Sequence, residues 1–271
     1  MHGLYDTGIE YLIRLRQRNL TNYQYRFENP DMWPIYPPDD EELAHVTTLQ
    51  LLVGGWEDYE HAIHLLESTP SLSSLDIQHD HKVSWPSIEF TRLCRGPRRL
   101  RSLRIENFCF TLGSSTIAGF VELEELEELQ LIDCEEYSCL SRDIKSLPLK
   151  LKAFCIHEID ETTELFSSVE NDLIRSLKPL VRMSLTLGID FGLPSNLLDW
   201  SALQAHALAL QYLRVEYTWP ELPFSKFHPG FAQFCKASLK LELLAISGVT
   251  VGHEDDDITH FLVRTACILS N

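Results

Sequence analysis

The spacing of hydrophobic residues changes within the stretch VELEELEELQLIDC, which covers residues 121–134. Leu123, Leu126 and Leu129 are three residues apart, as on one side of a helix, whereas Leu129 and Leu131 are two apart, as on one side of a strand. A coiled coil would keep its seam for about three or four heptads, and this pattern ends much sooner. The stretch therefore predicts a helix end that runs into a short strand, with the frame L-x-x-L-x-L.

The same six-residue frame recurs along the chain. Its second apolar residue, taken as a marker, falls at positions 49, 75, 103, 129, 154, 183, 213 and 244, at intervals of 25 to 31 residues. A weaker copy has its marker at Tyr23. Segments with helical spacing lie between the markers, with the apolar residues Ile63 and Leu66; Ile117, Phe120 and Leu123; Leu173, Leu177 and Leu180; and Phe231 and Phe234. A single unit of strand and helix cannot bury its apolar stripe, so we expect the units to stack around one shared core.

The segments SLSSLDI, RLRSLRI, LEELQLIDC, KLKAFCI and LQYLRVEY resemble the leucine-rich repeat family. The resemblance covers residues 46–249 well and 20–45 weakly. It implies an α/β solenoid of about eight or nine degenerate repeats, with a parallel β-sheet on the concave face and helices on the convex face. The family has Asn or Cys five residues after the marker, and here only Cys134 fits. The long, irregular units are most similar to the repeat regions of fungal F-box proteins.

Three parts are expected. Residues 1–45 hold an N-terminal helix with Ile9, Leu12 and Ile13 on one face, the weak first repeat, and a segment with four prolines at 29–40. That segment is interpreted as an extended connector within the first unit, with a flexible inter-domain linker as the alternative. Residues 46–249 form the repeat array. Residues 250–271 contain a C-terminal helix capped by Asp257, which is either a terminal cap or the first half of a unit without its strand.

Charge and cysteine usage narrow the class of protein. Forty acidic residues against 23 basic ones give a formal charge of −17, which disfavours binding to nucleic acid or to anionic membranes. The sequence has neither a secretory signal nor an apolar run near the roughly 18 residues of a membrane helix. Seven cysteines are scattered without a C-x-x-C pair, which predicts reduced thiols in a cytoplasmic or nuclear protein.

Candidates for chemistry are weak. The HDH at 79–81, with Asp76 nearby, suggests a metal, but polar loop residues after a strand explain it better. His61 and His64 fit an exposed helical face, and the acidic run from Glu122 to Glu128 fits a solvated passage from helix to strand. HEDDD at 253–257 lacks the ligand spacing of a calcium loop. Phosphate-binding and nucleophile motifs are missing, so we predict no enzyme, no cofactor and no metal site.

Strand geometry predicts the residues of the concave face. Positions one before, one after and three after each marker point away from the core. Over the eight strong repeats they include four acidic and three basic residues, so this face is nearly neutral in a chain of charge −17. The candidates for partner binding are Asp76, Gln78, Arg104, Glu106, Gln130, His157, Arg182, Thr186, Tyr212, Arg214 and Glu216.

A non-catalytic protein-interaction scaffold is the expected function, with its protein partner on the concave face. The resemblance to fungal F-box proteins implies the substrate-recognition part of a ubiquitin-ligase receptor. In those proteins an F-box segment that docks an adaptor precedes the repeats. That segment is not seen here, so the predicted role in a ubiquitin ligase depends on the repeats alone. Binding to an adaptor is expected only if an F-box lies upstream. An inhibitor or regulator of another enzyme, of the nuclease or GTPase class, is the alternative.

Overall fold

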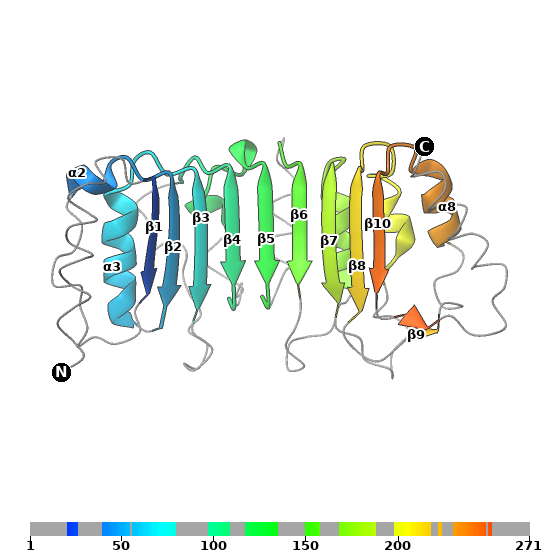
Figure 1. Ribbon diagram of the computed structural model, residues 1–271, viewed down its shortest axis with the longest axis horizontal. Coiled ribbons are helices and arrows are strands. Elements are labelled where there is room, and N and C mark those ends of the chain that lie inside the picture. Colours follow the sequence, from blue (N-terminus) through cyan, green and yellow to red (C-terminus); the bar gives the residue numbers. More distant parts are fainter. Residues whose placement is uncertain are drawn as a thin grey trace, which may run out of the picture.

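The protein is built around one curved parallel β-sheet (Figure 1). The computed structural model describes residues 21–26, 40–54, 56–79, 97–108, 117–134, 150–157, 168–187, 198–217, 222–223, 230–247 and 249–250. Nine strands lie side by side in the order of the sequence, and every neighbouring pair is parallel. They are β1 (Asn22–Arg26), β2 (Thr48–Val53), β3 (Ser74–His79), β4 (Ser102–Glu106), β5 (Glu128–Ile132), β6 (Ala153–His157), β7 (Arg182–Leu187), β8 (Tyr212–Tyr217) and β10 (Leu243–Ser247).

The markers of the repeated frame form one line across this sheet. Tyr23 pairs with Leu49 at one end, and Leu213 pairs with Leu244 at the other. Each marker between them is likewise in register with the markers of its neighbours. The predicted strands are therefore confirmed, including the weak copy at Tyr23.

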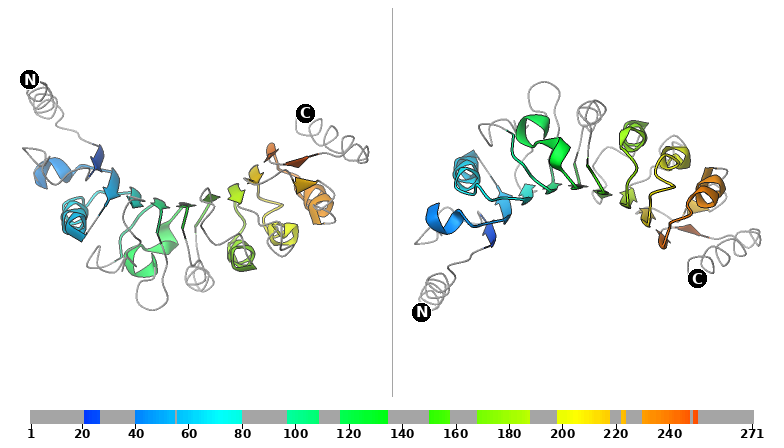
Figure 2. Two further views of the ribbon diagram at one scale, coloured as in Figure 1. Left: turned by 90° about the horizontal axis from the view of Figure 1, so that it is seen from below. Right: turned by 90° about the horizontal axis from the view of Figure 1, so that it is seen from above.

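Helices cover the convex side of the sheet, and the strands line the concave side (Figure 2). Parallel neighbours need a crossover between them, and the described helices of these crossovers lie on the same face of the sheet. The helices are α2 (Asp40–Leu43), α3 (Trp56–Glu67), α4 (Ile117–Phe120), the 3-10 helix η3 (Leu123–Glu125), α6 (Ser168–Ser176), α7 (Trp200–Leu203) and α8 (Gly230–Ala237). A small second sheet pairs β9 (Leu222–Pro223) with β11 (Val249–Thr250) in parallel. In the part of the chain that is described, no helix is long and apolar enough to cross a membrane.

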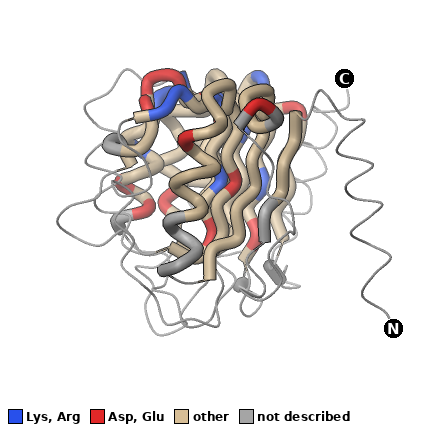
Figure 3. Tube along the Cα trace, turned by 90° about the vertical axis from the view of Figure 1, so that its left-hand side faces the viewer, with Lys and Arg blue, Asp and Glu red and all other residues tan. Residues whose placement is uncertain are grey.

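Acidic and basic residues lie along the edge where the strands begin (Figure 3), and ion pairs join neighbouring units there. Glu122, Glu125 and Glu127, from the acidic run, pair with Arg99, Lys150 and Lys152 at 3.0, 2.7 and 2.8 Å. The lysines lower the pKa values of Glu125 and Glu127, mainly through hydrogen bonds to their carboxylates. The run is thus a solvated face, as predicted, and it also contacts the units before and after it.

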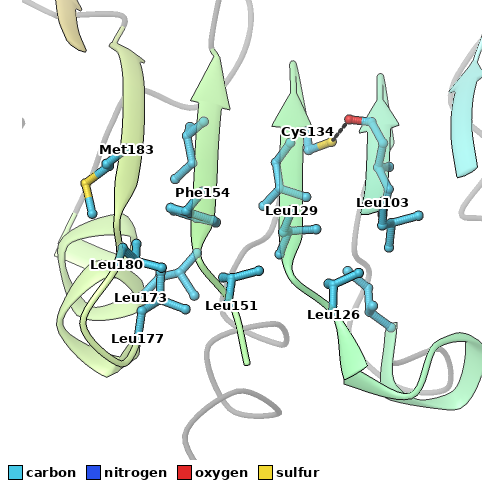
Figure 4. Close-up of a cluster of buried hydrophobic side chains, with 14 of the residues drawn as sticks. Leu103, Leu126, Leu129, Cys134, Leu151, Phe154, Leu173, Leu177, Leu180 and Met183 are labelled. Atoms are coloured by element: carbon cyan, nitrogen blue, oxygen red, sulfur yellow. Dashed lines mark hydrogen bonds between the residues drawn. The ribbon is translucent and has the colours of Figure 1, made fainter. Parts of the chain in front are cut away.

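The core lies between the sheet and the helices (Figure 4). The markers Leu129, Phe154 and Met183 are on neighbouring strands and are at most 2% exposed. The residue three before each of the eight strong markers is also buried, as Leu126 and Leu180 show. Burial of a leucine side chain contributes about 2 kcal/mol, so stacked units gain stability that a single unit lacks.

The structure corrects two expectations about helices. The opening stretch does run from helix to strand, but its helix is the 3-10 turn η3, separate from α4. The spacing of Leu173, Leu177 and Leu180 predicted one helix, whereas α6 ends at Ser176. Leu177 and Leu180 lie in the connection to β7 and are buried there, because core contacts alone can hold apolar residues at helical spacing. The predicted elements at 9–13, 29–39 and 257–268 lie outside the described residues.

Turn residues after two strands were missed by the sequence analysis. The Cys134 thiol lies 3.5 Å from the Ile105 carbonyl oxygen and 3.4 Å from that of Ile132, in line with the turn role predicted for it. One position earlier in the repeat, Asn107 and Asp133 have φ angles of 62° and 46°. The Asn107 side-chain amide donates to the His79 carbonyl oxygen at 3.1 Å. The left-handed backbone is therefore at the fourth position after the marker, where Asn and Asp are tolerated.

Candidate functional site

The concave face consists of three rows of side chains that cross the sheet. Register between neighbouring strands places them in line. The first row is Thr48, Ser74, Ser102, Glu128, Ala153, Arg182, Tyr212 and Leu243; the second is Gln50, Asp76, Arg104, Gln130, Cys155, Ser184, Arg214 and Ala245; the third is Leu52, Gln78, Glu106, Ile132, His157, Thr186, Glu216 and Ser247. All eleven predicted site residues are in these rows, and the rows agree with the predicted positions.

Two of the eleven residues are less accessible than expected. Thr186 is 3% exposed and Asp76 is 9% exposed. The short Thr186 side chain lies between the longer His157 and Glu216 in its row. Asp76 is covered by side chains that bond to it. Thr186 therefore offers little surface to a partner, Asp76 can act only through its neighbours, and partner binding at either residue stays a prediction.

Asp76 is the centre of a polar cluster on strands β2, β3 and β4. Arg104 contacts it through Nη1 at 2.8 Å and contacts Glu106 through Nη2 at 2.5 Å. Gln50 and Gln78 each donate from Nε2 to the Asp76 carboxylate at 3.3 Å. The cluster is largely saturated by its own contacts, so it presents little unused hydrogen-bonding capacity.

The other two arginines of the face differ from each other. Arg214 Nη2 pairs with Glu216 Oε2 at 2.6 Å. Arg182 is exposed and forms no ion pair with any residue that the structure describes. Within the described part of the chain, no carboxylate neutralises the Arg182 guanidinium group, whereas carboxylates pair with those of Arg104 and Arg214.

A hollow of about 320 Å³ lies beside Arg182, between β5 and β8. It exists because three adjacent row positions carry small side chains, namely Ala153, Cys155 and Ser184. Arg182 and Tyr212 line one side, and Glu128 and Gln130 line the other, with Gln130 Nε2 donating to Glu128 Oε1 at 3.1 Å. The hollow is at the lower end of the range for ligand pockets, large enough for one or two inserted side chains.

Cys155 contributes a neutral thiol to this hollow. Burial raises its pKa, and a hydrogen bond with Ser184 and the charges of Arg104 and Arg214 oppose that shift only in part. A thiol with a raised pKa is a poor nucleophile at neutral pH. The hollow is therefore suited to binding rather than to covalent chemistry.

Metal-ligating side chains do not gather in the part of the chain that the structure covers: no group of three or more His, Cys, Asp or Glu is close enough to hold an ion there. His79, predicted as a loop residue, is the last residue of β3 and packs edge-on against Phe108 at 6.0 Å between ring centroids. Asp80 and His81 are outside the described residues.

The hollow and two exposed leucines, Leu208 and Leu239, were not anticipated. The predicted rows already placed the small residues Ala153, Cys155 and Ser184 side by side, so the sequence contained a signal for the hollow. The leucines had none, because an exposed Leu in a Leu-rich chain has no distinct pattern.

Comparisons with known proteins give no further assignment. No family model matches the chain, and no curated protein matches it.

Proposed function

We propose that this protein is a non-catalytic interaction scaffold of the leucine-rich-repeat type, and that its concave face binds a protein partner. The observation that carries the proposal is the open row of strands with a hollow at its centre and, beside the hollow, Arg182, which pairs with no carboxylate among the described residues. The repeated frame and the stacked crossovers support the repeat type. Arg and Tyr, which this face presents at Arg182 and Tyr212, are over-represented at binding hot spots.

The dimensions of the face suit a protein partner. Neighbouring strands are about 4.8 Å apart, so nine strands span roughly 40 Å. A stable interface buries about 800 Å² on each partner, which a surface of this width can supply. The nearly neutral mixture of side chains also favours a protein over a nucleic acid, because binding to phosphate groups needs concentrated positive charge.

Two roles are compatible with such a scaffold. The resemblance to fungal F-box proteins favours substrate recognition for a ubiquitin ligase. Regulation of another enzyme, such as a nuclease or a GTPase, is the second candidate, and the same open face supports it.

Quantitative affinity capture tests the proposal. The full chain is compared with a concave variant, Gln130→Arg with His157→Glu, and with Lys236→Glu on the convex helix α8 as control. We expect at least one protein that is retained by the wild type and the control but lost with the concave variant. An adaptor and a cullin, retained by all three chains, would favour the ligase role, whereas a captured enzyme without them would favour the regulatory role. If no captured protein depended on the concave residues, the proposal would be wrong.

A further inference from the structure

Large exposed apolar side chains gather at one end of the molecule. Among the described residues, those with high exposure are Leu208, Leu239 and Leu243, at 68%, 82% and 44%. All three belong to the last two units of the sheet. Exposed apolar groups that cluster in this way mark interaction sites more often than scattered ones do.

The register brings one of these leucines, Leu243, close to the hollow. Arg182, Tyr212 and Leu243 are neighbours in the first row, on β7, β8 and β10. Leu208 and Leu239 are each five residues before a marker, so they lie in adjacent turns at the edge where β8 and β10 begin. The first row thus runs from Ala153 in the hollow, across Arg182, to Tyr212 and Leu243.

The described residues of this end carry a small excess of basic side chains. The described residues between 178 and 247 include five basic and three acidic side chains, although the whole chain has a formal charge of −17. The basic ones are Lys178, Arg182, Arg214, Lys236 and Lys240; the acidic ones are Asp199, Glu216 and Glu242. The described part of this end is therefore not acidic overall and does not repel an acidic partner segment.

We propose that the surface formed by the hollow, Arg182, Tyr212, Leu243 and Leu239 binds a partner segment in which an acidic residue is flanked by large apolar residues. This inference rests on the proposed function and specifies the chemistry of the partner. The carboxylate pairs with the Arg182 guanidinium, whose planar fork donates two parallel hydrogen bonds to the two carboxylate oxygens. One apolar side chain enters the hollow over Ala153 and Cys155, and the other packs on Tyr212 and Leu243.

The far wall of the hollow sets the order of the segment. Glu128 is two strands from Arg182, about 10 Å across the sheet. A second carboxylate placed in the hollow would face Glu128, whereas an apolar side chain there avoids this repulsion. The binding motif is therefore apolar, acidic, apolar, and not a run of acidic residues.

Selection from a random peptide library tests this motif. The full chain is immobilised, a phage library of random 12-residue peptides is selected against it, and the most enriched peptide is synthesised for fluorescence anisotropy. We expect enriched peptides with Asp or Glu between large apolar residues. Arg182→Glu should weaken binding by about 30-fold or more, as for a hot-spot residue, and should shift a new selection toward Lys or Arg at the same position.

Controls separate this inference from the general proposal. Arg101→Glu makes the same charge change on an exposed side chain three strands away, and binding should change less than about 3-fold. Leu239→Ser with Leu243→Ser should weaken binding by about 10-fold without loss of folding, checked by circular dichroism. If binding depended on Gln130 and His157 but not on Arg182, this inference would fail and the proposed function would stand. If binding depended on no concave residue, both would fail.

Other occupants are also distinguishable. Light scattering at the assay concentration reports whether the chain associates with itself. A dimer that Leu239→Ser with Leu243→Ser converts to a monomer would mean that a second copy covers this surface, and the proposal would be wrong. A selection without any enriched peptide would overturn it as well.

Discussion

Asn107 ends β4 with a backbone conformation that most side chains avoid. Its φ angle is 62°, its side chain is 3% exposed, and it donates to the buried carbonyl group of His79 on the preceding strand. One residue thus terminates a strand and links two units. Cys134 contributes a similar link after β5 through its thiol, and burial keeps that thiol neutral by raising its pKa to about 12.

Replacement of Asn107 tests this role. Asn107→Ala loses the hydrogen bond and puts a Cβ-bearing residue without local polar contacts in the left-handed region, so the free energy of unfolding should fall by about 2 to 4 kcal/mol. Asn107→Gly loses the hydrogen bond without adding strain in the left-handed region, so its free energy of unfolding should fall by only about 1 to 2 kcal/mol. Urea denaturation measures both. Equal losses, or a larger loss for the glycine variant, would contradict the assignment.

Alternation along each strand made it possible to predict which residues lie on the concave face. A strand exposes every second side chain, so the rows followed directly from the markers. The partners of each residue were not predictable. Arg104 follows its marker by one residue on β4 and Arg182 precedes its marker by one residue on β7, and nothing in the repeated frame says that, of these two, only Arg104 has described carboxylates beside it. Asn107 escaped notice because the expected turn position was one residue later.

His206 joins two convex elements. It follows α7, is fully buried, accepts a hydrogen bond from the Leu180 backbone N–H at Nδ1 (3.2 Å), and has Nε2 3.0 Å from the Ile174 carbonyl oxygen in α6. The neutral ring with its hydrogen on Nε2 satisfies both contacts. A protonated ring would direct a second N–H at the Leu180 N–H. Burial lowers the pKa of His206 and outweighs the hydrogen bonds that would raise it.

The lowered pKa of His206 predicts a pH dependence of stability. Well above pH 6.5, about the ordinary pKa of histidine, the ring is neutral in both the folded and the unfolded chain, so it does not make the free energy of unfolding depend on pH. Below that pH the unfolded chain binds a proton that the folded chain does not, so the free energy of unfolding falls, by up to about 1.4 kcal/mol per pH unit until the folded pKa is reached. Urea denaturation between pH 5 and 7.5 should show a shallower fall for His206→Gln than for the wild type.

The exposed His64 on α3 provides the matched control. His64→Gln should leave the difference between the wild type and His206→Gln unchanged. Parallel pH profiles for the wild type and His206→Gln would show that His206 is not held neutral.

Strands and helices differed in how well they could be predicted. Each strand repeats one apolar frame and pairs with neighbours that repeat it too. A strand with a weak frame, such as the one at Tyr23, could therefore be placed from its spacing to the next. Helices such as α2 and α7 have four residues, which is about one turn and too short for a period of 3.6 to be seen. Their positions depend on contacts such as the Asp199 side chain, which accepts a hydrogen bond from the Ser201 N–H at 2.8 Å.

Across the whole molecule, stacked units produce one long core and one long open face. The apolar residues share the interior between sheet and helices, while the acidic residues lie mainly outside the concave rows. This separation leaves a nearly neutral face on a strongly acidic chain. The extent of the concave face could be predicted from the number of repeats. The hollow and the exposed leucines became visible only with the side chains of the structure.

The alignment of neighbouring units is the central claim, and a disulfide across β6 and β7 tests it most directly. Cys155 and Ser184 are register partners, and their side chains form a hydrogen bond. Neighbouring strands are about 4.8 Å apart, which is within the range of Cα separations that a disulfide spans. Ser184→Cys should therefore cross-link to Cys155 under mild oxidation, as mapped by mass spectrometry of a non-reduced digest. Thr186→Cys, two residues out of register, and Ser184→Cys with Cys155→Ser should form no such link. Failure of Ser184→Cys to cross-link, or efficient cross-linking of Thr186→Cys to Cys155, would contradict the alignment of the concave face.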